Sequence, residues 1–116
     1  MRNSLISPVF SSPVDGAFAL QVSVRFFASL REIVGKKEET LEFSEGEKVT
    51  VDTVLKTLMQ RYGEPFVEYV YERATGEVKG FLQFLVNGKS ASILNGLETE
   101  LEDGDVVAIL PPVGGG

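Results

Sequence analysis

The last six residues of the 116-residue sequence, PPVGGG, contain the group with the clearest chemical use. Pro111 and Pro112 cannot donate to a sheet ladder, so they end the apolar run VVAIL and project the chain in an extended form. Six residues at about 3.3 Å each reach about 20 Å. Beyond Val113 no side chain remains, so the tail fits a channel too narrow for a Cβ atom and presents the carboxylate of Gly116.

A terminal carboxylate is a poor electrophile until it is activated. Once ATP has converted it to an acyl-adenylate, a sulfur or nitrogen nucleophile can attack the acyl carbon. The sequence therefore predicts a delivery arm that ends in Gly116. Terminal glycines are also typical of a merely disordered end, and this alternative describes a binding module with no chemistry in its tail.

The composition excludes several other kinds of site. The sequence has no Cys and no His, so it lacks a thiolate nucleophile, the commonest metal ligand and the commonest general base near neutral pH. No metal-ligand spacing and no pair of carboxylates stands out. We expect no bound metal, no stably bound cofactor and no catalysis by the chain alone.

The net charge of −6 argues against nucleic acid as a partner, because phosphate recognition depends on clustered Lys and Arg. No apolar run approaches the roughly 18 residues of a membrane span. Residues 1–19 contain two prolines and four serines without periodicity, which predicts a flexible leader rather than a secretory signal. We expect a cytoplasmic protein.

The first part of the chain predicts two strands with a short helical turn between them. Residues 20–27 alternate, with Val22, Val24 and Phe26 on one side, and Phe27 breaks the pattern by placing an aromatic side chain on the polar side. A short helical turn follows and ends at Gly35. A second strand is expected around residues 40–43.

The remainder predicts a helix, a polar segment and three more strands. Thr50 is the expected N-cap of a helix that ends at Gly63, and residues 64–80 indicate a weaker helix with a polar turn. The dipeptide Asn87-Gly88 predicts a tight hairpin after a strand over residues 82–86. The last strand is expected over residues 105–110.

This order of elements predicts an α+β fold, a mixed sheet of four to five strands crossed by one main helix. It suggests the ubiquitin-like β-grasp fold, in which the first and last strands lie side by side in parallel at the centre. We expect a leader over residues 1–19, a β-grasp domain over residues 20–112 and a flexible glycine tail over residues 113–116.

Three segments together are similar to a known family. The segments are VRFFASLREIVG, VNG and LEDGDVVAILPPVGGG, and with the order of elements between them they resemble the small, sulfur-carrier subunit of molybdopterin synthase over residues 20–116. The resemblance implies that Gly116 is adenylated by a ubiquitin-activating-like enzyme that uses ATP. Gly116 is then converted to a thiocarboxylate and donates its sulfur, inside the large subunit, to form the dithiolene of molybdopterin.

The resemblance also implies the residues that meet these partners. The tail of the family corresponds to Gly115 and Gly116, with Gly114 at a variable position. Phe27 on the first strand and Leu110 on the last are expected to form an exposed apolar patch beside the tail. Further contacts to the partners are expected from Arg31, Pro111, Pro112 and Val113.

Two other functions share the terminal glycines. A ubiquitin-like modifier would form isopeptide bonds with lysines of other proteins, since the same acyl-adenylate reacts with amines. A thiamine-pathway sulfur carrier has the same fold, although the Pro111-Pro112 and Phe26-Phe27 pairs favour molybdopterin. The segment over residues 64–80 is longer than the minimal family pattern and has no assigned role.

Overall fold

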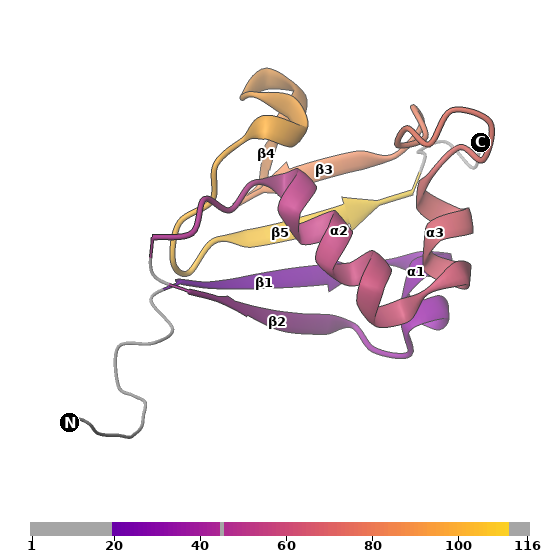
Figure 1. The fold of residues 1–116 in the computed structure, drawn as a ribbon, viewed down its shortest axis with the longest axis horizontal. Coiled ribbons are helices and arrows are strands. Elements are labelled where there is room, and N and C mark those ends of the chain that lie inside the picture. Colours follow the sequence, from indigo (N-terminus) through magenta and orange to yellow (C-terminus); the bar gives the residue numbers. More distant parts are fainter. Residues whose placement is uncertain (1–19, 45, 112–116) are drawn as a thin grey trace.

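The centre of the sheet is formed by the first and last strands. In this computed structural model, which describes residues 20–44 and 46–111, β1 (Leu20–Phe26) runs parallel to β5 (Val106–Leu110) (Figure 1). On the other side of β1 lies β2 (Glu38–Phe43), antiparallel to it. β5 pairs with β3 (Gln83–Val86), which pairs with β4 (Lys89–Ser90). The strand order β2-β1-β5-β3-β4 confirms the predicted mixed sheet.

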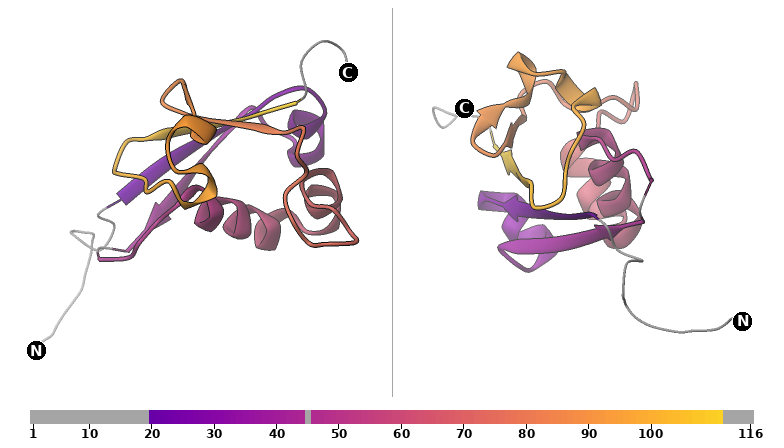
Figure 2. Two further views of the ribbon diagram at one scale, coloured as in Figure 1. Left: turned by 90° about the horizontal axis from the view of Figure 1, so that it is seen from above. Right: turned by 90° about the vertical axis from the view of Figure 1, so that its left-hand side faces the viewer.

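The predicted leader and glycine tail, residues 1–19 and 113–116, lie outside the described residues. The helices within the described part are α1 (Ala28–Val34), α2 (Val51–Tyr62) and α3 (Glu64–Val70). Two short 3-10 helices, η2 (Ala91–Ile93) and η3 (Gly96–Glu98), connect β4 to β5. Figure 2 shows α2 and α3 on the same side of the sheet.

The main helix begins and ends where its sequence predicts. Thr50 and Thr53 form a reciprocal capping box, in which each side chain bonds to the backbone N–H of the other. Asp52 adds negative charge to the first turn, and Gly63 ends the helix with a φ of 74°. The apolar face of α2 packs on the sheet through four buried residues: Val51, Val54, Leu55 and Leu58.

The core lies between this helix layer and one face of the sheet. Alternate residues of β1 and β5 are buried there, and Phe66 and Val70 of α3 extend the core beyond α2. The buried positions of the strands are Val22, Val24, Phe26, Leu41, Phe43, Phe84, Val86, Val107 and Ile109. Period-two burial of this kind is what a sheet with one covered face requires.

Two turns hold the ends of the central strands. Asn87 and Gly88 both have positive φ, 51° and 85°, as the tight hairpin between β3 and β4 requires. The Asn87 side chain also donates to Asp105 Oδ1 and accepts from the N–H of Val106, at 2.9 Å each. Asp103 Oδ1 accepts from the N–H of Gln21 at 2.8 Å, so this turn fastens the start of β5 to the start of β1.

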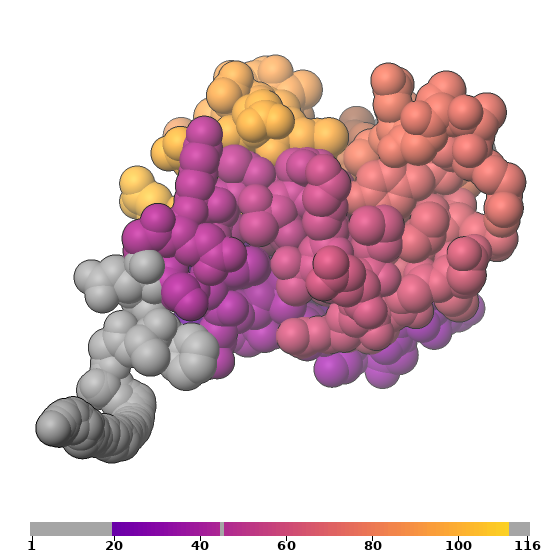
Figure 3. Space-filling model, in the orientation of Figure 1, coloured from indigo at the N-terminus to yellow at the C-terminus, as the bar shows by residue number. Residues whose placement is uncertain are grey.

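The segment over residues 64–80 is a short helix followed by a closed polar turn. α3 ends at Val70, and Tyr71 then forms an antiparallel bridge with Val78. Inside this bridge the N–H of Glu72 donates to the carbonyl oxygen of Glu77 at 2.7 Å, and Gly76 turns the chain with a φ of 74°. The predicted weaker helix with a polar turn is confirmed, and Figure 3 shows this segment beside α2 on the surface.

Within residues 20–44 and 46–111, none of the helices has the length and apolar character needed to cross a membrane.

Candidate functional site

The strand that leads to the tail is held on both sides. The last pair between β1 and β5 joins Phe26 to Ile109, and β3 pairs Gln83 with Leu110. Pro111 follows as a half-buried residue outside the strand. The chain therefore leaves the sheet from a fixed point. The predicted site residues Pro112, Val113, Gly114, Gly115 and Gly116 lie outside the described residues.

The predicted position of Phe27 within the first strand is wrong. β1 ends at Phe26, and Phe27 is the N-cap residue of α1, with extended φ and ψ of −131° and 152°. Because its backbone continues the extended form, its side chain alternates with the fully buried Phe26 and belongs to the opposite face. It follows the last β1–β5 pair by one residue, as Leu110 does on β5.

The expected exposure of this pair is also corrected. Phe27 and Leu110 are both half-buried, whereas the large apolar side chains that are exposed among the described residues are Phe81, Ile93 and Leu94. Neighbouring strands shield an apolar side chain on the face of a sheet even where no helix packs on it. The pair therefore offers a shallow apolar surface rather than protruding side chains.

Ala28 causes the change of direction after Phe27. Its φ of 54° lies in the left-handed region, which is unfavourable for a residue with a Cβ atom. The chain turns there from β1 into α1, and the helix ends at Gly35 with a φ of 82°. No sequence signal indicates this turn, because Ala is not a residue that usually adopts positive φ.

Four half-buried apolar residues form a strip on the face of the sheet opposite α2. Val106, Ala108 and Leu110 alternate along β5 with the buried residues of that strand, and Leu85 of β3 pairs with Ala108. We call these four residues the outer strip. On the other side Ala108 pairs with Arg25, whose exposed side chain borders the strip. Of these four residues, the sequence predicts only Leu110 as part of a contact surface, and the contribution of Leu85 depends on the pairing of β3 with β5.

Arg31 lies on α1, one helical turn after Phe27. Its side chain is exposed and forms no ion pair with the described residues. Its backbone carbonyl accepts from the N–H of Gly35 at 2.9 Å and so closes the helix. The side chain is free for the partner contact that the resemblance implies, and that role stays a prediction.

The most connected carboxylate lies on the opposite side of β1. Glu39 of β2 accepts hydrogen bonds from the Tyr62 hydroxyl and from Arg61, both near the end of α2, and pairs with Lys36 at 3.1 Å. Burial alone would raise the pKa of Glu39, but the bonds from Tyr62, Lys36 and Arg61 outweigh it and lower that pKa. Burial and the bond to Glu39 raise the pKa of Tyr62 to about 12. These contacts anchor α2 to the sheet edge.

Within the described part of the chain, no group of three or more acidic side chains is placed to hold a metal ion.

The sequence profile of the ThiS family matches residues 24–116, which is most of the chain. This chain belongs to the ThiS family. The match begins in β1 and extends through the terminal glycines, so it covers both the outer strip and the tail.

Two curated relatives of this ThiS-family protein are archaeal. Small archaeal modifier protein 3 of Haloferax volcanii is 36% identical over 97 residues, which cover 84% of this chain and the whole of the relative. A putative sulfur carrier protein of Archaeoglobus fulgidus is 39% identical over 72 residues, which cover 62% of this chain and 80% of the relative.

Solved structures show the same fold. The solution structure of small archaeal modifier protein 1 from Methanosarcina acetivorans has a TM-score of 0.69 and 39% identity, and covers 84% of this chain and 97% of that one. A putative molybdopterin converting factor, subunit 1, from Pyrococcus furiosus has a TM-score of 0.62 and 31% identity. The match covers 81% of this chain and 99% of that one. This chain is thus a ubiquitin-like β-grasp protein of the sulfur carrier and modifier type, and the predicted fold is confirmed.

Proposed function

We propose that this protein is a carrier whose working group is the C-terminal carboxylate of Gly116. The observation that supports this proposal is that the strand before the tail, β5, is held in the sheet on both sides. β5 is paired on both sides up to Leu110, and the sequence then continues with Pro111 and ends in glycines. A rigid body with a narrow, chemically plain arm can bind an enzyme through its surface while the arm reaches into a separate active site.

The chemistry takes place on partner enzymes and needs ATP. A carboxylate oxygen of Gly116 attacks the α-phosphorus of ATP, and pyrophosphate leaves. A sulfide equivalent, held as such by the activating system, then attacks the acyl carbon and AMP leaves. The product is a thiocarboxylate. Since the chain has no Cys, its own side chains offer no competing thiol to the activated acyl group.

The sulfur then passes to a pterin precursor in the large subunit of molybdopterin synthase. This destination is supported by the motifs of the first and last strands and by the likeness to the molybdopterin converting factor subunit of Pyrococcus furiosus. In this proposal the protein is not an enzyme by itself, and its partners are that large subunit and a ubiquitin-activating-like adenylyltransferase. We propose the cytoplasm as the place of this reaction, because the activating step needs ATP.

The outer strip is the proposed contact surface for both partners. It lies along β5, the strand that leads to the tail, and Phe27 and Leu110 stand at the end where the tail begins. A partner that covers the strip would place the entrance to its own active site within the reach of residues 111–116. Arg25 and Arg31 would meet acidic groups around that entrance.

A second candidate is conjugation to lysines of other proteins. It is favoured by the two relatives named small archaeal modifier proteins, which match at 36% and 39% identity. The steps are the same up to the acyl-adenylate, after which a lysine amine displaces AMP and an isopeptide bond forms. Both outcomes can belong to one chain, because they differ only in the nucleophile.

The decisive experiment measures the intact mass of the protein after incubation with its activating enzyme, ATP and a sulfide source. We expect one sulfur-for-oxygen exchange, located in the C-terminal peptide. A chain without Gly115 and Gly116 should fold normally, because every buried core residue of the described part lies between Val22 and Ile109, and it should stay unmodified. The positive control is a carrier protein that the same enzyme preparation is known to modify. If that control is modified and the full-length chain is not, the proposal is contradicted.

The second candidate is tested in cell extracts from the source organism. Tryptic peptides whose lysines carry the residues of this C-terminus would establish conjugation. If such peptides are absent while the thiocarboxylate is present, the protein acts as a sulfur carrier alone.

A further inference from the structure

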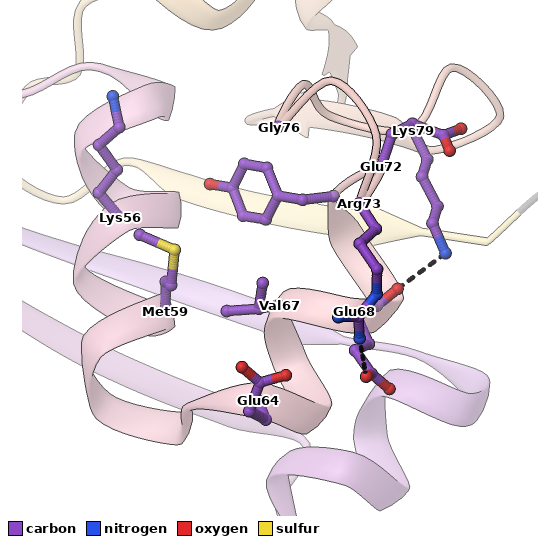
Figure 4. A pocket seen from close by; sticks show the side chains of 10 residues that line it. Lys56, Met59, Glu64, Val67, Glu68, Glu72, Arg73, Gly76 and Lys79 are labelled. Carbon is purple, nitrogen blue, oxygen red and sulfur yellow. Dashed lines mark hydrogen bonds and ion pairs between the residues drawn. The ribbon is translucent and has the colours of Figure 1, made fainter.

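A pocket on the helical side of the molecule is not used by the proposed function. It has a volume of about 660 Å³ and lies between α2, α3 and the closed turn over residues 71–80. Met59 of α2, Val67 of α3 and the ring of Tyr71 provide its apolar lining. Figure 4 shows Met59 and Val67 facing the space between the two helices. We call this the helix-side pocket.

The helix-side pocket and the outer strip are on opposite faces of the sheet. The pocket is built on α2 and α3, which lie on one side of the sheet (Figure 2). The strip consists of residues of β3 and β5 that alternate with the buried ones and therefore point to the other face. An occupant of the pocket would leave the outer strip accessible. The pocket is built largely by the segment over residues 64–80, for which the carrier function gives no reason.

The basic residues around the pocket have partners within the described structure. Lys56 pairs with Asp52 at 2.9 Å, and Arg73 pairs with Glu68. Lys79 donates to the backbone carbonyl of Glu68 at 2.7 Å. Lys56 and Arg73 are therefore each paired with a carboxylate, whereas the ammonium of Lys79 meets only a neutral carbonyl and keeps its charge.

Two acidic residues of the lining are not compensated in this way. Glu64 and Glu72 line the pocket, and neither side chain makes a hydrogen bond or ion pair with another residue of the described part. In Figure 4 the carboxylate of Glu64 points toward Val67. Two unpaired carboxylates against the one unpaired ammonium of Lys79 leave a negative balance around the apolar lining, which favours an occupant that carries a positive charge.

Tyr71 adds a second unsatisfied group. Its ring lines the pocket, and its hydroxyl is buried without a hydrogen-bond partner among residues 20–44 and 46–111. Buried hydroxyls are normally hydrogen-bonded. A small local opening would let an acceptor oxygen of an occupant reach this hydroxyl, and the backbone carbonyls of a peptide are such acceptors.

We propose that the helix-side pocket binds a short segment of a partner polypeptide that carries a Lys or Arg beside an aliphatic residue. The aliphatic side chain packs on Met59 and Val67, and the cationic group lies near Glu64, whose carboxylate points toward Val67. Glu72 lies beyond the other end of α3 and adds only to the negative charge around the pocket. A backbone carbonyl of the segment meets the Tyr71 hydroxyl. This surface is independent of the fate of Gly116, so the carrier body can hold one protein on its helical side while it presents its tail to another.

The test uses the full-length protein and three capped tripeptides, acetyl-Leu-Lys-Leu-amide and its analogues with Ala or Glu at the centre. Amide shifts in NMR spectra of the labelled protein report where each peptide binds. We expect the Lys peptide to shift resonances of residues 56–59 and 64–79, with an affinity that falls as salt is added. The Ala peptide should bind more weakly, and the Glu peptide weakest of the three.

Matched variants separate local charge from net charge. Glu64→Gln with Glu72→Gln should weaken binding of the Lys peptide roughly fivefold, the effect of losing partly exposed charge pairs. Glu77→Gln with Glu102→Gln removes the same total charge from exposed positions that do not line the pocket, and should leave the affinity unchanged. The proposal would be overturned if the three peptides bound with equal affinity, or if both double variants lost the same affinity for the Lys peptide. It would also be overturned if the amide shifts were confined to β3 and β5, or if no shifts occurred.

Discussion

At the scale of single residues, Glu39 shows how one carboxylate can connect two elements. It lies on β2, beside the end of α2, and receives hydrogen bonds from Tyr62 and Arg61 of that helix. The second strand expected from the sequence, around residues 40–43, begins just after Glu39, so no role for this residue is predicted. In the structure β2 begins at Glu38, so Glu39 alternates in step with the buried Leu41 and pairs with Val24 on the covered face.

This arrangement predicts a stability that depends on pH. Because the folded protein lowers the pKa of Glu39 from its ordinary value of 4.5, the ionised carboxylate stabilises the fold above that pH. The contribution is lost as pH falls through the lower folded pKa. Near neutral pH, Glu39→Gln should reduce the free energy of unfolding by roughly 1–2 kcal/mol, as expected for hydrogen bonds to a charged group.

Urea unfolding at several pH values measures this effect. The difference between the wild type and Glu39→Gln should shrink as the solution is made more acidic than pH 4.5. Glu38→Gln, at the neighbouring exposed position, is the control and should change stability by less than about 0.5 kcal/mol. A difference that stays constant down to low pH would show that the ionised carboxylate is not the stabilising group.

At the scale of elements, the junction between β1 and α1 is the part that sequence patterns describe least well. Alternation places Phe27 on an extended backbone and on the correct face, but it does not indicate that the strand has ended. The cause is Ala28, whose positive φ has no signature in the residue type. By contrast, Thr50, Gly63 and Asn87-Gly88 predict a cap or a turn from their residue types. The Thr50 side chain caps the helix, and the glycines adopt a positive φ because they have no side chain.

The junction yields a prediction about strain. Ala28→Gly removes the Cβ atom that makes a positive φ unfavourable, and this relief of roughly 1–2 kcal/mol exceeds the roughly 0.5–1 kcal/mol of extra chain entropy. The variant should therefore be as stable as the wild type or slightly more stable in thermal unfolding. Ser29→Gly, one residue further into α1, has no strain to relieve and should lower stability. Equal losses in both variants would contradict a strained turn at Ala28.

At the scale of the whole molecule, the sheet separates two surfaces with different properties. The outer strip is apolar and narrow, and its contact role is tested by Ala108→Arg, which places a charge at its centre. Folding should be preserved, because Ala108 is outside the buried core. Binding to the activating enzyme and to the synthase large subunit should weaken roughly tenfold, as for a central interface position.

Thr40→Arg adds the same charge to the same face of the sheet, but on the edge strand β2, and should bind both partners normally. Calorimetric titration with each purified partner gives the affinities. If Ala108→Arg bound both partners with unchanged affinity, the outer strip would not be the contact surface.

The architecture of this protein can be predicted from its sequence more completely than its binding surfaces. The elements and their order along the chain follow from alternation, caps and turn residues, because these are local signals, and the family follows from the terminal motif. The parallel pairing of the first and last strands is expected from the resemblance to the β-grasp fold. The outer strip and the helix-side pocket depend on pairs such as Leu85 with Ala108 and Tyr71 with Val78. No local pattern encodes such contacts, so the residues beside Leu110 and the role of the segment after Gly63 could not be derived from the sequence.

The parallel pair at the centre of the sheet affects how the protein is made. Ser23 pairs with Val106, so β1 has only one neighbour until the ribosome has translated β5, more than 80 residues later. A nascent or prematurely terminated product without β5 would expose the open edges of β1 and β3, a recognised aggregation hazard. The folded body thus appears only after synthesis passes β5, and incomplete products should be removed by proteolysis instead of competing for partners.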